Sequence, residues 1–215
     1  MTAASQDKLR FQNAVTRTQD NIQNRLDTYI TLLRAGSALF AAHEQVSLVQ
    51  FRAFVQRLKL QERYPGIQGI GFSRRVSSEE LPALISDMQK QGVKNFSLRP
   101  NYNRSEYHSI IYLEPLDRRN QAAIGYDMFT EPVRRAAMER ARDTGTVAAS
   151  GKVTLVQEID QHKQAGFLIY IPVYRQGIIP NTASARRANL LGFIFSPYRA
   201  DDLLQGILAE NDSPW

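Results

Sequence analysis

One long helical stretch constrains the fold of this chain more than any other feature. From Gln6 to about Ala42 the sequence contains no proline, and apolar residues recur at intervals of three, four and seven, at Phe11, Val15, Ile22, Leu26, Tyr29 and Leu33. This spacing predicts an amphipathic helix with a narrow apolar stripe. A helix of some thirty residues would be about 45 Å long, which exceeds the width of a small domain. The first half of the helix therefore either projects and pairs with a second copy or packs on its own domain, and the pattern leaves both arrangements open.

Shorter helices and strands follow this stretch. Helical spacing marks 47–60, a capping pair of Ser77 and Glu80 opens a helix that ends at Gly92, and a last amphipathic helix covers 200–209. Apolar runs predict strands near 67–72, 95–98, 108–113, 147–157, 166–174 and 190–195. This order predicts an α+β fold in which helices cover the face of a mainly antiparallel sheet.

The clearest of the shorter helices lies between Thr130 and Gly145. Thr130 is its expected N-cap, Pro132 stands in its first turn, and Gly145 is its expected terminator. Its expected buried residues are Val133, Ala137 and Ala141. Asp127 precedes the helix at a strand end, where it is either a surface or capping acid or a carboxylate that faces a ligand. The sequence favours neither of these two interpretations of Asp127.

The C-terminal part of the chain suggests a domain boundary. A polar loop covers 176–189, and it is followed by the strand at 190–195 and the helix at 200–209. One strand and one helix cannot bury their apolar faces alone. We therefore expect this last segment to open a second small domain.

Composition narrows the class of protein. With 215 residues, 43% apolar and 22% charged, the chain can form one large domain or two small ones with a real core. Its net charge of +6 is spread over residues that cluster no further than pairs, which favours a solvated basic surface over a nucleic-acid footprint. No apolar run is long enough to span a bilayer, and 1–12 lacks a signal peptide. A protein that works outside the cytoplasm would then be an excised segment without its membrane anchors.

The sequence lacks the residue patterns that enzymes and metal sites need. It has no cysteine, no Gly-x-Ser-x-Gly elbow, no paired metal-binding histidines, and only three histidines, at His43, His108 and His162. The glycines of 66–71 have the wrong spacing for a nucleotide-binding loop. We therefore expect a binding module that is not an enzyme and that has neither a cofactor nor a bound metal.

Four phrases of the sequence resemble one known family. They are YPGIQGIGFSRRV from Tyr64, HSIIYLEPLDRRNQAAIGYDMFTEPVRRAAMERARDTG from His108, VTLVQE from Val153 and GFLIYIPVY from Gly166. These phrases are similar to those of bacterial CHASE domains. The matching stretches run from about Tyr64 to Tyr174, and the Gly-Tyr-Asp-Met segment is the most specific of them.

The resemblance implies a fold and a cellular setting. It implies a stalk helix over 1–42, a membrane-distal PAS-like ligand-binding domain over 43–175, and a linker with part of a membrane-proximal PAS-like domain over 176–215. It also implies the periplasmic part of an inner-membrane receptor, a histidine kinase or diguanylate cyclase, in which the membrane is reached only through flanking helices outside this chain. The stalk helices of two copies would form a homodimer.

The resemblance also implies a ligand site. In the plant members the ligand is an adenine derivative gripped by an aspartate, and the matching residue here is Asp127. The predicted ligand contacts are Asp127, Met128, Ala149, Leu155, Gln157, Glu158, Tyr170 and Tyr112. For the two tyrosines, ordinary core packing is the alternative. The identity of the small-molecule ligand stays open, and the alternative function is a structural or dimerisation module whose core holds no ligand.

Overall fold

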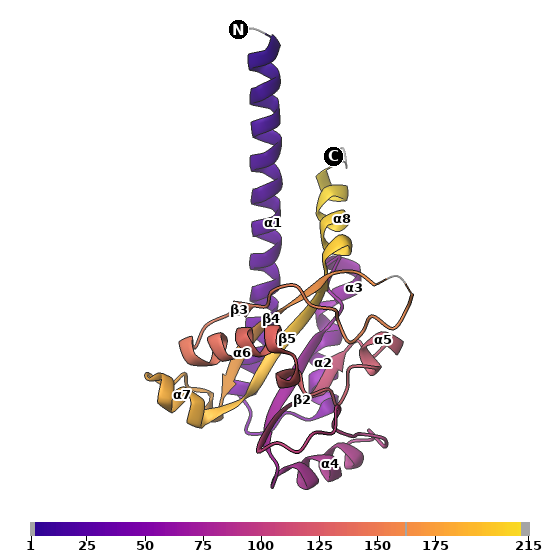
Figure 1. Cartoon of the computed structure of the whole chain (residues 1–215), viewed down its shortest axis with the longest axis vertical. Coiled ribbons are helices and arrows are strands. Elements are labelled where there is room, and N and C mark those ends of the chain that lie inside the picture. The colour runs from indigo at the N-terminus through magenta and orange to yellow at the C-terminus, as the bar shows by residue number, and fades with distance from the viewer. Residues whose placement is uncertain (1–2, 162, 212–215) are drawn as a thin grey trace.

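A single sheet organises the protein. The computed structural model describes residues 3–161 and 163–211, so His162 lies outside the described residues. Five antiparallel strands lie in the order β2-β1-β5-β4-β3 (Figure 1). Their bounds are β1 Ile70–Ser77, β2 Glu106–Glu114, β3 Ala148–Ala149, β4 Gly166–Tyr174 and β5 Leu190–Arg199. The expected α+β class is confirmed, with a mainly antiparallel sheet and helices on its faces.

The helices surround this sheet. They are α1 Ala3–Ala41, α2 Leu48–Leu58, α3 Leu60–Arg63, α4 Leu81–Lys90, α5 Arg118–Gln121, α6 Pro132–Thr144, α7 Ala183–Asn189 and α8 Ala200–Asn211. Two short 3-10 turns, η1 at Met128–Thr130 and η2 at Arg175–Gly177, complete the set. The predicted strand at 95–98 is absent, and of 147–157 only two residues belong to a strand. The expected pairing of Ser77 with Glu80 is confirmed, since each side chain accepts a hydrogen bond from the other residue's backbone N–H.

The long N-terminal helix is confirmed, and its two halves differ. Tyr29 and Leu33 are fully buried against the domain, where α1 packs on β4, β5 and α8. The first half of α1 extends far beyond the sheet (Figure 1), and Phe11 there is 70% exposed. Within one chain, the apolar stripe of α1 is therefore covered only in its second half.

Two hydrophobic cores lie on opposite faces of the sheet. On one face, α1 and α2 pack on the sheet through contacts such as Phe40 stacked on Phe72, with ring centroids 4.0 Å apart. On the other face, α6 and the segments around it form what we call the α6-side core. Its buried residues are Ile110, Leu113, Ala123, Met128, Phe129, Ala137, Met138, Ala141, Val153, Leu155, Leu168, Tyr170, Tyr174, Leu190, Phe193 and Phe195.

Helix α6 differs in one detail from its prediction. Its N-cap is Glu131 and not Thr130, because the Glu131 carboxylate accepts the backbone N–H groups of Val133 and Arg134. Arg134 lies on the buried face with Ala137 and Ala141, as expected for those two alanines, whereas Val133, also expected inside, is 38% exposed. Gly145 ends the helix in a left-handed conformation, as predicted.

The last strand does not open a second domain. Strand β5 lies in the centre of the sheet, paired with β1 through Phe72 opposite Ile194 and with β4 through Tyr170 opposite Phe195. The expected linker at 176–189 contains η2 and α7, and α7 is held to α6 by the ion pair of Arg187 with Asp143. A second PAS-like domain is thus not present in the described residues, because β5 buries both of its edges in the first sheet.

This topology predicts the fate of a shortened chain. A fragment of residues 1–175 lacks β5, so β1 and β4 lose the strand that joins them, together with its buried side chains. Because domain stability is a small difference of about 5–15 kcal/mol, we expect the fragment to show no cooperative thermal unfolding by circular dichroism. The full chain should unfold cooperatively under the same conditions. A sharp transition in the fragment would contradict the central role of β5.

Candidate functional site

Asp127 is buried at the edge of the sheet. The segment 125–127 runs along the outer edge of β2. There the Ile110 N–H donates to the Tyr126 carbonyl, and the Gly125 N–H donates to the Ile110 carbonyl. The Asp127 Oδ1 accepts the N–H groups of His108 at 2.9 Å and Phe129 at 3.2 Å. Its Oδ2 lies 3.2 Å from the guanidinium of Arg104, whose side chain is 25% exposed. The carboxylate therefore fixes η1 and points inward, while its role as a ligand contact stays a prediction.

The structure separates the other predicted site residues into groups. Met128, Leu155 and Tyr170 lie together in the α6-side core. Tyr112 lies on the opposite face of the sheet, where its ring stacks on Phe51 and its hydroxyl donates to Val46 O at 3.0 Å. Ala149 is exposed at the edge strand β3. The structure thus brings only the first three of these residues into one place.

Gln157 and Glu158 belong to a loop that is tied to α8. The buried Glu158 carboxylate lies 2.8 Å from Arg199 Nε and 3.7 Å from Arg119. Arg199, at the end of β5, also pairs with Asp202 of α8 at 2.9 Å. Gln157 is buried and donates to Asn120 over 3.4 Å. The charges of this loop are therefore matched within the protein, and they join it to the start of the last helix.

The α6-side core contains polar atoms that have no partner among the described residues. They are Ser73 Oγ, His108 Nδ1, Arg134 Nε and Tyr170 OH, all fully buried. Three of them surround Phe193: its ring lies 5.6 Å from that of His108 and 6.1 Å from that of Tyr170, and Ser73 is its neighbour across the β1–β5 pair. Each unsatisfied buried group costs about 1–3 kcal/mol. Such a cluster is unusual in a core that serves only packing.

His108 presents a hydrogen-bond acceptor to this core. Its ring is fully buried and stacks on Phe129 with centroids 3.7 Å apart. Burial lowers the pKa of His108, so the imidazole is neutral near pH 7. The Nε2 atom lies 3.2 Å from the Glu106 carboxylate and must carry the ring proton. The unpartnered Nδ1 is then free to accept a hydrogen bond.

Tyr170 and Arg134 present donors. Burial raises the pKa of Tyr170 far above its ordinary value, so the phenol keeps its proton. The Arg134 side chain lies over the ring of Tyr126 at 5.2 Å and donates one hydrogen bond, to Thr154 O at 3.2 Å. The α6-side core therefore combines an acceptor, hydroxyl groups and a cation with apolar side chains.

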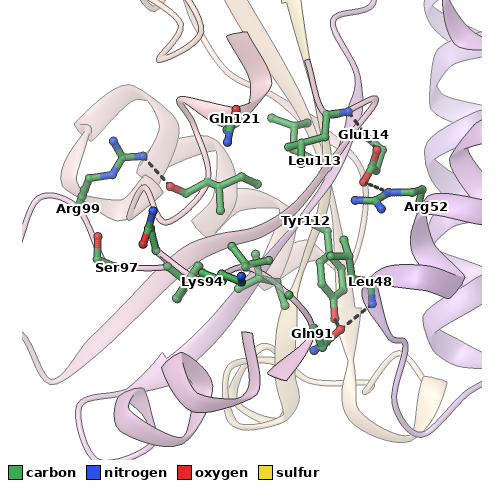
Figure 2. Close-up of a pocket in the computed structure, with 17 residues that line it drawn as sticks. Leu48, Arg52, Gln91, Lys94, Ser97, Arg99, Tyr112, Leu113, Glu114 and Gln121 are labelled. Atoms are coloured by element: carbon green, nitrogen blue, oxygen red, sulfur yellow. Dashed lines mark hydrogen bonds and ion pairs between the residues drawn. The ribbon is translucent and has the colours of Figure 1, made fainter. Parts of the chain in front are cut away.

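A groove lies on the other side of β2. It has a volume of about 690 Å³ between α2, the segment 91–99 and β2 (Figure 2). Its polar groups are largely paired: Gln91 accepts from Leu48 N and Tyr112 OH, Arg52 pairs with Glu114, and Arg99 donates to two backbone carbonyls. Tyr112 is the one predicted site residue that lines this groove.

The groove and the α6-side core share a wall. Leu113 and Ile124 line the groove, and both also contact the α6-side core. The groove has the size of a small-molecule site. Its matched charges make it a weaker candidate than the α6-side core, where buried polar atoms lack partners.

Sequence reasoning missed three residues of this core. Ser73 and His108 lie on strands whose other inward residues are apolar, and Arg134 lies on the helical stripe of Ala137, Met138 and Ala141. The sequence does contain a signal for such residues, namely a polar residue at a position where the amphipathic pattern expects an apolar one. For Arg134 the predicted buried face of α6 ran through Val133, whereas the buried face runs through Arg134 and Met138.

The comparison with protein families agrees with the resemblance of the phrases. Residues 44–214 match the CHASE domain, and the chain therefore belongs to the CHASE domain family. CHASE domains are extracellular sensory domains of signalling receptors. No curated protein matches the chain. Within the described residues, none of the helices is both long and apolar enough to span a bilayer, and no three potential ligands gather into a metal site.

The burial of His108 predicts a pH dependence of stability. Since the folded pKa of His108 lies below 6.5, the unfolded chain binds its proton more readily. The free energy of unfolding is therefore highest with respect to His108 above about pH 6.5. It falls with decreasing pH by about 1 kcal/mol per pH unit until the folded pKa of His108 is reached. In urea unfolding at several pH values between about 7.5 and 5.5, His108→Gln should flatten this decline.

His43 provides the matched control. It is exposed, so His43→Gln should keep the pH profile of the parent protein. Equal pH profiles for the parent and His108→Gln would contradict the neutral buried state of His108.

Proposed function

We propose that this CHASE domain senses a small polar molecule that binds in the α6-side core. The proposal rests above all on the buried polar atoms of Ser73, His108, Arg134 and Tyr170, which lack partners among the described residues. A bound molecule that pairs with them would remove their desolvation cost. The receptor would be an inner-membrane histidine kinase or diguanylate cyclase, with this domain in the periplasm.

The connections of the core suggest how binding would reach the membrane. Leu155 is part of the α6-side core, and three residues later Glu158 is paired with Arg199, the last residue of β5 before α8. Helices α1 and α8 run side by side, with the N-terminal end of α1 and the C-terminal end of α8 pointing the same way (Figure 1). A ligand that moves the 155–158 loop would therefore shift α8 against α1. Only a ligand that binds the two arrangements unequally can signal.

For an adenine-like ligand, we propose Asp127 as the residue that accepts hydrogen bonds from the ligand. Among the charged groups of the described residues, its Oδ2 contacts only the partly exposed Arg104, at 3.2 Å. Ring or amine N–H groups of a ligand could replace this contact without disturbing the backbone bonds to Oδ1. An adenine derivative is accordingly one candidate ligand.

A second candidate function is dimerisation, and one observation favours it. On one face of the projecting half of α1, the apolar side chains of Phe11 and Val15 are exposed. They continue the stripe that Tyr29 and Leu33 bury lower on the helix. A parallel second copy of α1 would cover them, so the domain would act as a dimer whether or not it binds a ligand.

The dimer proposal predicts the effect of one charge. Phe11→Glu should weaken self-association at least about tenfold, because burial of a Phe side chain is worth about 1.5–3 kcal/mol. Sedimentation equilibrium over a range of concentrations would measure this change. Gln12→Glu adds the same charge at the neighbouring exposed position and should have a much smaller effect. A parent protein that stays monomeric throughout would refute the dimer.

The ligand proposal predicts opposite behaviour for two buried tyrosines. Tyr170→Phe removes a hydroxyl without a partner, so the ligand-free protein should keep or gain stability. Tyr112→Phe removes a hydroxyl bonded to Val46 O and Gln91, and should cost about 1 kcal/mol. Urea unfolding of both variants and the parent measures the difference. If Tyr170→Phe loses as much stability as Tyr112→Phe, the Tyr170 hydroxyl has a structural partner and the ligand proposal loses its main support.

A further inference from the structure

We infer that the ligand of the α6-side core carries a single carboxylate group and that Arg134 binds it. This inference rests on the proposed function, because it concerns the same site. It names the chemical class of the ligand, which neither the family match nor the resemblance of the phrases provides.

Arg134 occupies a position that a cation rarely takes. It stands in the first turn of α6 and is 1% exposed, among the largest fully buried side chains of the protein. Its neighbours on the same helical face are Ala137, Met138 and Ala141, all buried in the α6-side core. An arginine cannot lose its charge inside a protein, so this core contains a permanent positive charge.

No acid in the described part of the chain neutralises this charge. The Glu131 carboxylate is used for the cap of α6, and Asp127 pairs with Arg104. The described salt bridges contain none with Arg134, and its Nε has no hydrogen-bond partner. The neighbouring Arg135 shows the ordinary case, since it is 50% exposed and pairs with Glu139 at 3.0 Å. A buried cation without a counter-charge is strongly unfavourable, so an anion from outside the chain is the natural partner.

The surroundings favour a carboxylate over other anions. One unpaired positive charge matches one negative charge, whereas a phosphate dianion would leave an excess charge against apolar walls. The planar guanidinium fits the two oxygens of a carboxylate, and Tyr170 OH can donate a further hydrogen bond. The walls from Leu155, Leu168 and Phe195 would contact an apolar body. The predicted ligand is therefore an organic monocarboxylate with a short apolar part.

The first experiment needs no ligand. Arg134→Met replaces the charge by an apolar side chain of similar length, and it should raise the melting temperature of the ligand-free protein by about 2–4 °C. Arg135→Met is the matched control on the surface, and it should leave the melting temperature unchanged or slightly lower. A marked fall for Arg134→Met would assign Arg134 a structural role and overturn the inference.

The second experiment uses defined probes. The parent protein is melted with acetate, propionate, benzoate, pyruvate and the L-amino acids, each beside its neutral amide, and with adenine and adenosine. At saturation, at least one carboxylate should raise the melting temperature by about 5 °C or more, and its amide should not. Calorimetry with that carboxylate should show at least about a hundredfold loss of affinity in Arg134→Met and unchanged affinity in Arg135→Met.

A second variant distinguishes loss of binding from loss of folding. Arg134→Lys keeps the charge but loses the fork of N–H groups, so it should fold and bind the carboxylate about tenfold more weakly. If adenine, adenosine or the amides stabilise the protein and no carboxylate does, the sensor stands and this inference fails. If no probe of any class stabilises the parent protein, both this inference and the proposed sensor are contradicted.

Discussion

The pairing of β5 with both β1 and β4 is the interaction on which the rest of the structure depends. β1 is distant from β5 in the chain, and β5 is the strand that joins the β1–β2 pair to the β3–β4 pair. The pairing places Phe193 between His108 and Tyr170 and sets Ser73 beside it. Because β5 leads directly into α8, the same strand connects the polar groups of the α6-side core to the helix that leaves the domain.

The local parts of this fold were predictable from the sequence. The stripe of α1, the reciprocal capping of Ser77 and Glu80, and the glycine at the end of α6 each follow from residues a few positions apart. The central place of β5 was not predictable from a single sequence, because strand order depends on pairings across more than a hundred residues. The turn residues Gly177 and Pro180 favoured a boundary, whereas the chain only changes direction there and returns to the same sheet.

Only some of the predicted site residues lie together in the structure. Met128, Leu155 and Tyr170 meet in one core. Of these three, only Tyr170 lies on a predicted strand that forms, because Met128 belongs to η1 and Leu155 to a loop. Tyr112 lies on the opposite face of the sheet, because β2 carries an irregularity opposite Phe72 and Ser73 that changes the faces of its side chains. Arg134 was missed because Ala137 and Ala141 fit a buried face through Val133 as well as one through Arg134, and the apolar side chain was the expected one.

The unpaired polar groups of the α6-side core do not stabilise the fold, so we expect them to serve a function. Replacing buried polar groups that lack partners with apolar ones commonly stabilises a protein, and sites of function are where such groups are kept. The groove along β2 is the rival location, about 690 Å³ in volume but with its charges matched inside the protein.

A crystal structure of the domain with its most stabilising carboxylate would decide between the two locations. We expect carboxylate oxygens within about 2.7–3.2 Å of Arg134 Nε, with Tyr170 OH as a further donor. The same compound bound in the groove along β2, with Arg134 surrounded only by protein and water, would contradict it.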